Sequence, residues 1–476
     1  MYFKKLLFLI FFTYISFTHL FAQDNFDLVI NRSDCSQIVF SPIERKNDYL
    51  LAYNIAGCTD KESNIIILSK KGKILDSIPV KSFFGSDFLL QSMVQVNNEY
   101  YLFGFEDVPN DSVTKIIFCK VDTSFKLVAK NIFSIGTPYK NSDLDRISIK
   151  LNKDKSQFYF VYGKTFGNLS YAGSIDIDLK KVTIKNVSKT ISDIFEITEL
   201  KNKQGFLITG IDYQFKTDTL FGNIQKLNFT KDLHQTQSIS RLDNKYYFAG
   251  EAYKDDNFLK SQHDIIIIKV NDSFQIEKKL RIGKGGDTTS KIGIKGLSIG
   301  SSNRIYVAGL TFTDYINGSY DSWLNISVLD SNLNLIGTKY LKGTDFNAPL
   351  GIIETGDKNI LFCGFITPKN EKTKAFVTKI NINNFLTADT DLKFYEPLIK
   401  FFPNPVQDEL VVEFQEYDNQ HDIKLQIYNS LGKLVHSEEG NLPYQRIDVR
   451  DFSNGIYFYN LYVANQLIKT GKFIKN

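Results

Sequence analysis

The sequence predicts an all-β protein, with a β-propeller followed by a small immunoglobulin-like β-sandwich. Short aromatic and aliphatic runs that end in glycine recur through most of the chain, and polar turns join the strands that follow them. Strand–turn–strand patterns continue to the last residue. Phe (40) and Tyr (25) are abundant while Met (2) and Trp (1) are scarce, a composition that favours sheets. No long stretch has helical periodicity.

The N-terminal segment has the parts of a signal peptide. Lys4 and Lys5 provide the positive charge, and an unbroken apolar run follows from Leu6 to Phe12. A membrane anchor is the alternative, but about 20 apolar residues are needed to span a bilayer. We therefore expect residues 1–22 to be removed, with cleavage between Ala22 and Gln23. We expect no transmembrane segment in the mature chain.

Charge and cysteine content limit the classes of partner and compartment. Lys and Arg number 57 against 53 Asp and Glu, a formal net charge of +4, so no basic surface suited to nucleic acid is expected. Cys35 and Cys58 fall in the first repeat and could form a local disulfide in an oxidising compartment. Cys119 and Cys363 lie in apolar strand patterns, where buried thiols are common.

Internal repetition predicts the propeller over residues 24–395. Seven runs recur: "YLLAY" (49–53), "YYLFG" (100–104), "FYFVYG" (158–163), "FLITG" (206–210), "YYFAG" (246–250), "IYVAG" (305–309) and "ILFCG" (360–364). Six of the runs end in glycine, and Tyr53 stands in the glycine's place in "YLLAY". We expect each run to be a buried strand, where the glycine permits a bulge or a close approach to a neighbouring backbone. Turns such as "DTSF" and "NDSF" lead to further strands, so one repeat reads as one blade. Seven blades are expected, with six or eight left open; separate β-sandwiches are disfavoured because no linker separates the copies.

One repeat carries a family resemblance. Residues 263–312 resemble the bacterial propeller repeats often called SBBP, in which a strand, a turn and a second strand precede Gly-Gly and a strand that ends in glycine. Gly285 and Gly286 supply the Gly-Gly pair, whereas the usual tryptophan before it is absent. The resemblance implies a propeller and no catalytic residues.

The C-terminal segment begins with a stiff joint. After a linker at 396–400, Pro403-Asn404-Pro405 cannot form a regular inner strand, and an alternating strand follows it. Gly432 and Lys433 lie in a hairpin turn. Gly455 and Tyr457 begin the next hairpin, and Lys472 lies in its final strand.

These motifs resemble the type A C-terminal sorting domain of the type IX secretion system in Bacteroidetes, over residues 401–476. The resemblance implies a route through the periplasm and across the outer membrane, directed by contact with the type IX machinery. It also implies a secreted or cell-surface product.

The rest of the sequence has few residues arranged as in known catalytic or metal-binding motifs. The four histidines of the expected mature chain (His234, His263, His421 and His436) lie far apart, and we expect His263 in a solvated loop. We predict no catalytic residue, no metal site and no cofactor. The favoured function is a non-enzymatic module whose propeller face binds a glycan or protein. The alternative is a hydrolase or lyase acting on polysaccharide, which would need carboxylates around the central channel at glycosidase separations.

Overall fold

The computed structural model divides the chain into two compact units, Met1–Thr387 and Ala388–Asn476. It describes residues 25–476 except 32–34, 57–61, 85–87, 107–113, 136–144, 165–168, 190, 192–193, 202–203, 211–212, 228–232, 254–262, 284–288, 313–321, 387–397, 416–422, 441–443 and 464–465. The predicted signal peptide, with Ala22 and Gln23, lies outside the described residues. Each unit is considered by itself below.

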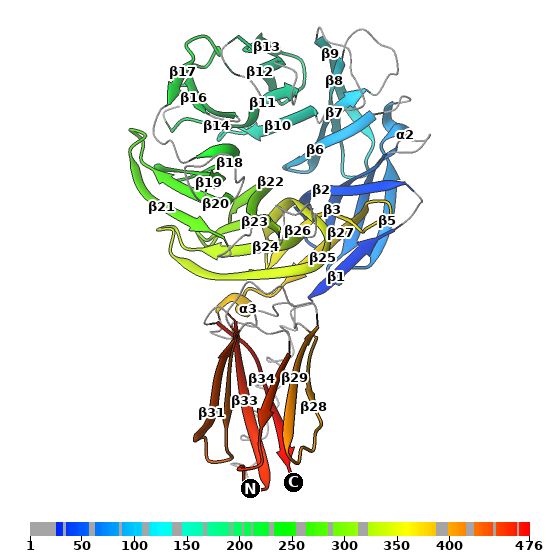
Figure 1. Cartoon of the computed structure of the whole chain (residues 1–476). Coiled ribbons are helices and arrows are strands. Elements are labelled where there is room, and N and C mark those ends of the chain that lie inside the picture. The colour runs from blue at the N-terminus through cyan, green and yellow to red at the C-terminus, as the bar shows by residue number, and fades with distance from the viewer. Residues whose placement is uncertain are drawn as a thin grey trace, which may run out of the picture. The chain divides into compact units, whose positions relative to one another are not determined.

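The first unit is built from antiparallel sheets whose strands follow chain order (Figure 1). The first two sheets contain β2 (Ser36–Glu44), β3 (Asp48–Ala56), β4 (Glu62–Ser69) and β5 (Ile74–Pro79), then β6 (Phe88–Val96), β7 (Glu99–Glu106), β8 (Thr114–Val121) and β9 (Leu127–Ile135). The third and fourth contain β10 (Asp145–Leu151), β11 (Gln157–Lys164), β12 (Leu169–Asp176) and β13 (Val182–Asn186), then β14 (Ile194–Glu199), β15 (Phe206–Gly210), β16 (Gln214–Thr217) and β17 (Gln225–Leu227). The fifth contains β18 (His234–Leu242), β19 (Lys245–Tyr253), β20 (His263–Val270) and β21 (Ile276–Ile282).

The remaining strands form one seven-stranded sheet in the order β1-β27-β26-β25-β24-β23-β22. Its members are β1 (Phe26–Ile30), β22 (Thr289–Ile299), β23 (Ile305–Phe312), β24 (Ser322–Leu329), β25 (Leu335–Glu354), β26 (Ile360–Thr367) and β27 (Lys374–Ile380). The long β25 pairs with β24 through its first half and with β26 through its second half, so two four-stranded groups share it. The short helices α2 (Lys81–Phe84) and α3 (Asn383–Leu386) complete the elements described in this unit.

The innermost strands form a closed ring. Each one contacts the innermost strand of the next sheet, from β2 through β6, β10, β14, β18 and β22 to β25 and back to β2, and these strands surround a common centre (Figure 1). The ring closes non-covalently, because β1 pairs with β27 from Phe26 opposite Lys379 to Ile30 opposite Ala375. The propeller class is thereby confirmed, and within the described residues its sheets form seven four-stranded groups.

The repeated glycine stands where the two innermost strands of a blade approach closely. Gly104 lies opposite Leu90, and the register shifts between Leu90 and Ser92. Gly210, Gly309 and Gly364 lie opposite similar shifts. A Cβ on Gly104 would come within 2.1 Å of the Leu89 carbonyl oxygen, a separation that no side chain tolerates. The expected close approach is thus present, and it accommodates a bulge in the innermost strand.

In the runs that begin with two tyrosines, "YYLFG" and "YYFAG", the two residues have different structural roles. The first packs on the turn of its own blade, as Tyr100 stacks on Phe125 and Tyr246 on Phe274. Phe125 and Phe274 occupy left-handed positions in those turns, with φ of 59° and 60°. The second aromatic reaches the next blade, where the Tyr101 hydroxyl donates to the Ile177 carbonyl at 3.0 Å. The run therefore fixes both the turn within a blade and the packing between blades.

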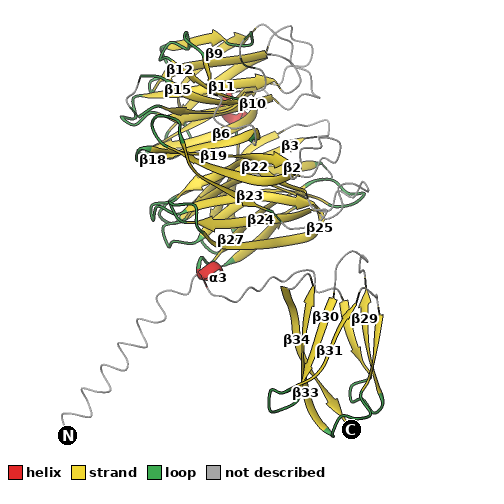
Figure 2. Ribbon diagram, turned by 60° about the vertical axis from the view of Figure 1, so that its left-hand side comes forward, coloured by secondary structure: helices red, strands yellow, loops and turns green. Residues whose placement is uncertain are grey.

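The second unit is a β-sandwich of seven strands among the described residues (Figure 2). One sheet has the order β28-β29-β32 and the other β31-β30-β33-β34. The strands are β28 (Leu398–Phe402), β29 (Glu409–Gln415), β30 (Ile423–Tyr428), β31 (Leu434–Gly440), β32 (Tyr444–Asp448), β33 (Gly455–Val463) and β34 (Gln466–Lys475). Its core joins both sheets and includes Val412, Leu425, Ile447 and Phe473. No described strand of this unit pairs with a strand of the propeller.

The boundary between the units differs from the expected linker. The linker was placed at residues 396–400, but β28 begins at Leu398, so residues 398–400 belong to the sandwich. The mistake has a simple cause: β28 pairs with β29 on only one side and lies at the edge of its sheet. An edge strand next to proline has a weak sequence signal.

Replacing Gly104 with alanine should destabilise the propeller by at least about 2 kcal/mol, because the added Cβ meets main-chain atoms. The thermal unfolding of the Gly104→Ala chain, followed by circular dichroism, measures this. Gly356→Ala is the matched control, since its Cβ would lie 3.6 Å from the nearest atom, a side-chain oxygen of Glu44. Equal melting temperatures for the two variants would contradict the close-approach argument.

Candidate functional site

Polar side chains from the bulged innermost strands line a cavity of about 220 Å³ at the centre of the ring. Ser92 and Glu196 follow the register shifts in β6 and β14, and each stands opposite the residue that precedes a repeat glycine. Ser238 of β18 is the third residue in this position. The bulge interrupts the alternation of the strand, so a polar side chain can face the channel while its apolar neighbours pack between the blades.

Lys295 contributes an ammonium group to this cavity. It lies in the irregular part of β22, with φ of 52°, and is half-buried. Its Nζ donates to Ser92 Oγ at 3.0 Å and to Ser41 Oγ at 3.4 Å. Burial strips water from the ammonium and lowers the pKa of Lys295 to about 8, although the negative charge of Glu196 opposes this effect. Lys295 forms no ion pair with any described carboxylate.

Glu196 is already engaged on both of its oxygens. Oε1 lies 2.6 Å from Lys150 Nζ, and Oε2 accepts a hydrogen bond from the Ile239 main-chain N–H at 2.8 Å. Its side chain is 5% exposed while that of Lys150 is 39% exposed. A buried carboxylate held by two such contacts is fixed in position. Glu196 therefore anchors Lys150 at the channel wall.

One hydroxyl group on the cavity wall has no partner in the structure. Ser148 lines the cavity and is 4% exposed, and its Oγ makes no hydrogen bond. Because buried hydroxyls normally find a partner, this atom indicates that the channel has unused hydrogen-bonding capacity. The Oγ of the fully buried Ser238 in β18 is also unpartnered, but Ser238 is not among the residues that line the cavity.

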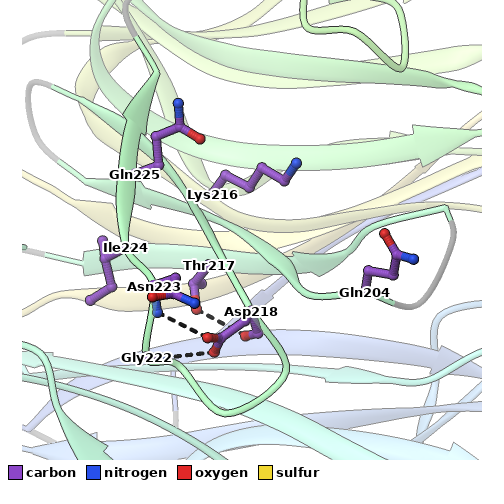
Figure 3. Close-up of a pocket in the computed structure, with 8 residues that line it drawn as sticks. All are labelled: Gln204, Lys216, Thr217, Asp218, Gly222, Asn223, Ile224 and Gln225. Atoms are coloured by element: carbon purple, nitrogen blue, oxygen red, sulfur yellow. Dashed lines mark hydrogen bonds between the residues drawn. The ribbon is translucent and has the colours of Figure 1, made fainter.

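A second hollow, of about 480 Å³, lies on the outer strands of the fourth blade (Figure 3). Its carboxylate, Asp218, is turned into its own loop and accepts from the main-chain N–H groups of Gly222 at 2.7 Å and Asn223 at 3.0 Å. The bond from Gly222 is the largest of the effects that lower the pKa of Asp218. The carboxylate serves the loop, so this hollow is the weaker candidate.

The expectation for His263 was wrong. The residue is buried at the start of β20, and its Nδ1 lies 2.9 Å from Glu251 Oε2. The sequence places it before a polar aspartate, which suggested a loop, but β20 already pairs with β19 at this point. Among the described residues, no group of three or more His, Cys, Asp or Glu side chains could hold a metal ion.

The cysteine pattern is described in part. Cys35 is disulfide-bonded, and Cys119 and Cys363 are buried free thiols. Burial raises the pKa of both thiols, so neither is a reactive nucleophile at neutral pH. Cys58 lies outside the described residues, and the Cys35–Cys58 pairing stays a prediction.

In the C-terminal unit, the Pro403-Asn404-Pro405 segment ties the first strand to the last. Both of its X-Pro bonds are cis. Asn404 Oδ1 accepts from the Ile474 main-chain N–H at 3.0 Å, and Val406 N–H donates to the Ile474 carbonyl at 2.8 Å. Val406 itself is buried in the core. The joint therefore closes one end of the sandwich.

The remaining motif residues shape two turns and the sheet they join. Gly432 has φ of 76° in the turn where Asn429 Oδ1 accepts from Lys433 N–H. Gly455 has φ of 154° at the start of β33. The hydroxyl of Tyr457 donates to the Ser453 carbonyl at 2.8 Å, much as in the tyrosine corner of immunoglobulin-like domains. Lys472 is exposed on β34 opposite Phe458.

Residues 400–476 match the model of one protein family, the secretion system C-terminal sorting domain. The chain carries a sorting domain at its C-terminal end. This implies export by the type IX secretion system, and the resemblance inferred from the three motifs is confirmed. No curated protein matches the sequence.

Solved structures similar to the chain include one β-propeller domain, and the three named here are similar at very low identity. The β-propeller domain of the trilobed protease from Pyrococcus furiosus is 11% identical, covers 75% of this chain and 99% of its own, and has a TM-score of 0.42. The AfRom2 CNH domain is 10% identical, with the same coverages and TM-score. A protein from Lactobacillus plantarum is 10% identical, covers 87% and 99%, and has a TM-score of 0.43.

Several large apolar side chains of the sorting domain are exposed. Ile456, Phe458 and Ile474 lie on one face of its larger sheet at 42–47% exposure, and Leu431 at the hairpin tip is 90% exposed. None of the described helices is both long and apolar enough to cross a membrane. The motif residues of the sorting domain stabilise the β-sandwich. The candidate binding site is the cavity in the propeller.

The channel residues were not predicted from the sequence, although it contains a signal for them. Ser92 precedes Gly104 by 12 residues, and Glu196 and Lys295 each precede their repeat glycines by 14. Polar residues at that distance stand in the innermost strand, just past the bulge for Ser92 and Glu196 and within it for Lys295. Reading backwards from each repeat glycine would therefore have found them.

The lowered pKa of Lys295 should make the free energy of unfolding depend on pH. Between its pKa of about 8 and the ordinary 10.5, the folded state releases a proton that the unfolded state keeps, so this residue makes the fold more stable as pH rises. The stability of the native chain relative to Lys295→Met should increase by up to about 1.4 kcal/mol per pH unit in that window. Urea unfolding from pH 7 to pH 10 measures it.

The charged and titratable groups that face Lys295 are Glu196, Lys150 and Cys363. All three are the same in both proteins, so their own titration is common to both curves. Parallel stability curves for the native chain and Lys295→Met would show that the ammonium is fully hydrated, against this prediction.

Proposed function

We propose that the mature chain is an exported, non-enzymatic binding protein that holds its ligand in the propeller channel. The sorting domain acts as the address label, and the propeller is the cargo that works at the cell surface or after release. The boundary between them lies before Leu398, where the sandwich begins.

The observation that carries this proposal is the composition of the channel wall. Of the described residues that line the cavity, Glu196 is the one carboxylate, and it is already paired with Lys150. Glycosidases need two carboxyl groups about 5–9.5 Å apart. Hydroxyl groups and ammonium groups favour recognition over hydrolysis.

The alternative of a polysaccharide lyase has one observation in its favour. An amine with a pKa of about 8, as for Lys295, is deprotonated in a useful fraction near neutral pH and could remove a proton. The cavity offers no second group already placed to protonate a leaving oxygen, since Lys150 is held by Glu196. Binding without turnover is the better supported function.

Binding and turnover can be separated in one screen of the mature chain. An array of neutral and acidic glycans is tested for binding, and the same glycans are assayed for new reducing ends and for absorbance from unsaturated products. We expect a bound glycan class with no product. Product formation that disappears in Lys295→Met would replace the binding proposal with the lyase.

Deleting residues 398–476 should retain the protein in the periplasm. The propeller shares no described strand with the sorting domain, so the truncated chain should keep its fold while losing its address. Cell fractionation with surface protease treatment measures the location, and far-ultraviolet circular dichroism of the truncated protein is the control for folding. A truncated chain that reaches the surface as efficiently as the full chain would contradict the sorting assignment.

A further inference from the structure

Two lysines and one carboxylate line the cavity, so its described wall has a surplus of one positive charge. Lys150 and Glu196 form an ion pair and cancel. Lys295 remains, with only the hydroxyls of Ser41 and Ser92 as hydrogen-bond partners. An ammonium in a site shielded from water is stabilised by a nearby anion.

The hydroxyl groups complement this charge. A serine hydroxyl can donate one hydrogen bond and accept others. Lys295 Nζ donates to Ser41 and Ser92, which leaves the hydrogens of both hydroxyls available for an acceptor. Ser148 Oγ, buried and unpartnered on the wall of the same cavity, adds a third donor. The described wall therefore offers one cation and three O–H donors.

We propose that the channel binds an oxyanion, such as the carboxylate or sulfate group of a small or terminal saccharide, on Lys295 with Ser41, Ser92 and Ser148. An oxyanion accepts several charge-assisted hydrogen bonds at once, which is what this donor set supplies. The cavity of about 220 Å³ is several times the ~30 Å³ share of one water molecule and suits one charged group or a small ring. The inference specifies the ligand of the binding function proposed above and rests on it.

Isothermal titration calorimetry on the full mature chain tests the inference with three probes. Sodium sulfate and sodium glucuronate are compared with glucose, which has glucuronate's ring without its charge, and ionic strength is matched with chloride. We expect one or both anions to bind and glucose not to bind. Sulfate alone would assign the site to sulfate groups, and glucuronate would assign it to carboxylated sugars.

Variants identify the site that binds the probe. Lys295→Met should weaken binding of the anion at least tenfold, and Ser148→Ala, which removes only an unpartnered hydroxyl, should weaken it several-fold without affecting folding. Lys153→Met is the control, because Lys153 is an exposed lysine on the turn after β10. Above pH 8 the affinity of the native chain should fall by about tenfold per pH unit as Lys295 loses its proton.

Three results would overturn the inference. They are the absence of binding by both anions, binding that Lys295→Met leaves unchanged, and glucose binding as well as glucuronate does. If neutral glycans bind on the array while both anions fail, the binding function stands and only the oxyanion assignment falls.

Discussion

The propeller depends on one close contact, between the innermost strand of a blade and the glycine of the strand beside it. At Gly104 and Gly364 a carbonyl oxygen of the innermost strand occupies the space of a Cβ. That approach accommodates a bulge in the innermost strand, and opposite Gly104 and Gly210 the bulge is followed by a polar residue that lines the channel, Ser92 and Glu196. In these two blades the fold and the candidate site therefore have the same origin.

An exposed edge strand has unpaired backbone groups, and the propeller and the sorting domain each cover such an edge with their own residues. In the ring, β1 covers the open edge of β27, so the first strand of the described chain completes the last sheet. In the sorting domain, the Pro-Asn-Pro joint ties Asn404 and Val406 to the final strand. No described strand of one unit pairs with a strand of the other. A self-contained module of this kind can be recognised while the cargo beside it is already folded.

The sequence contained much of the fold and little of the site, for a physical reason. The second strands are buried on both faces, so they appear as continuous aromatic and aliphatic runs such as "YYLFG". Their turns carry Asp or Asn because side chains such as Asp122 accept main-chain hydrogen bonds there. The innermost strands break their own alternation at the bulges, which hid Ser92, Glu196 and Lys295. The closing strand β1 has no repeat signature at all, because its partner β27 lies at the far end of the repeats.

Lys295 shows why the channel, rather than another surface, is the functional candidate. Removing water from an ammonium costs free energy, and the lowered pKa of this residue records that cost. The two serine hydroxyls offset it only in part, since neutral acceptors stabilise a cation less than a carboxylate does. A methionine would fill the same space without a charge. Under the proposed function, the Lys295 ammonium destabilises the protein without ligand and stabilises it when an anion is bound in the channel. The reason is that the attraction between the two charges is stronger in a site shielded from water.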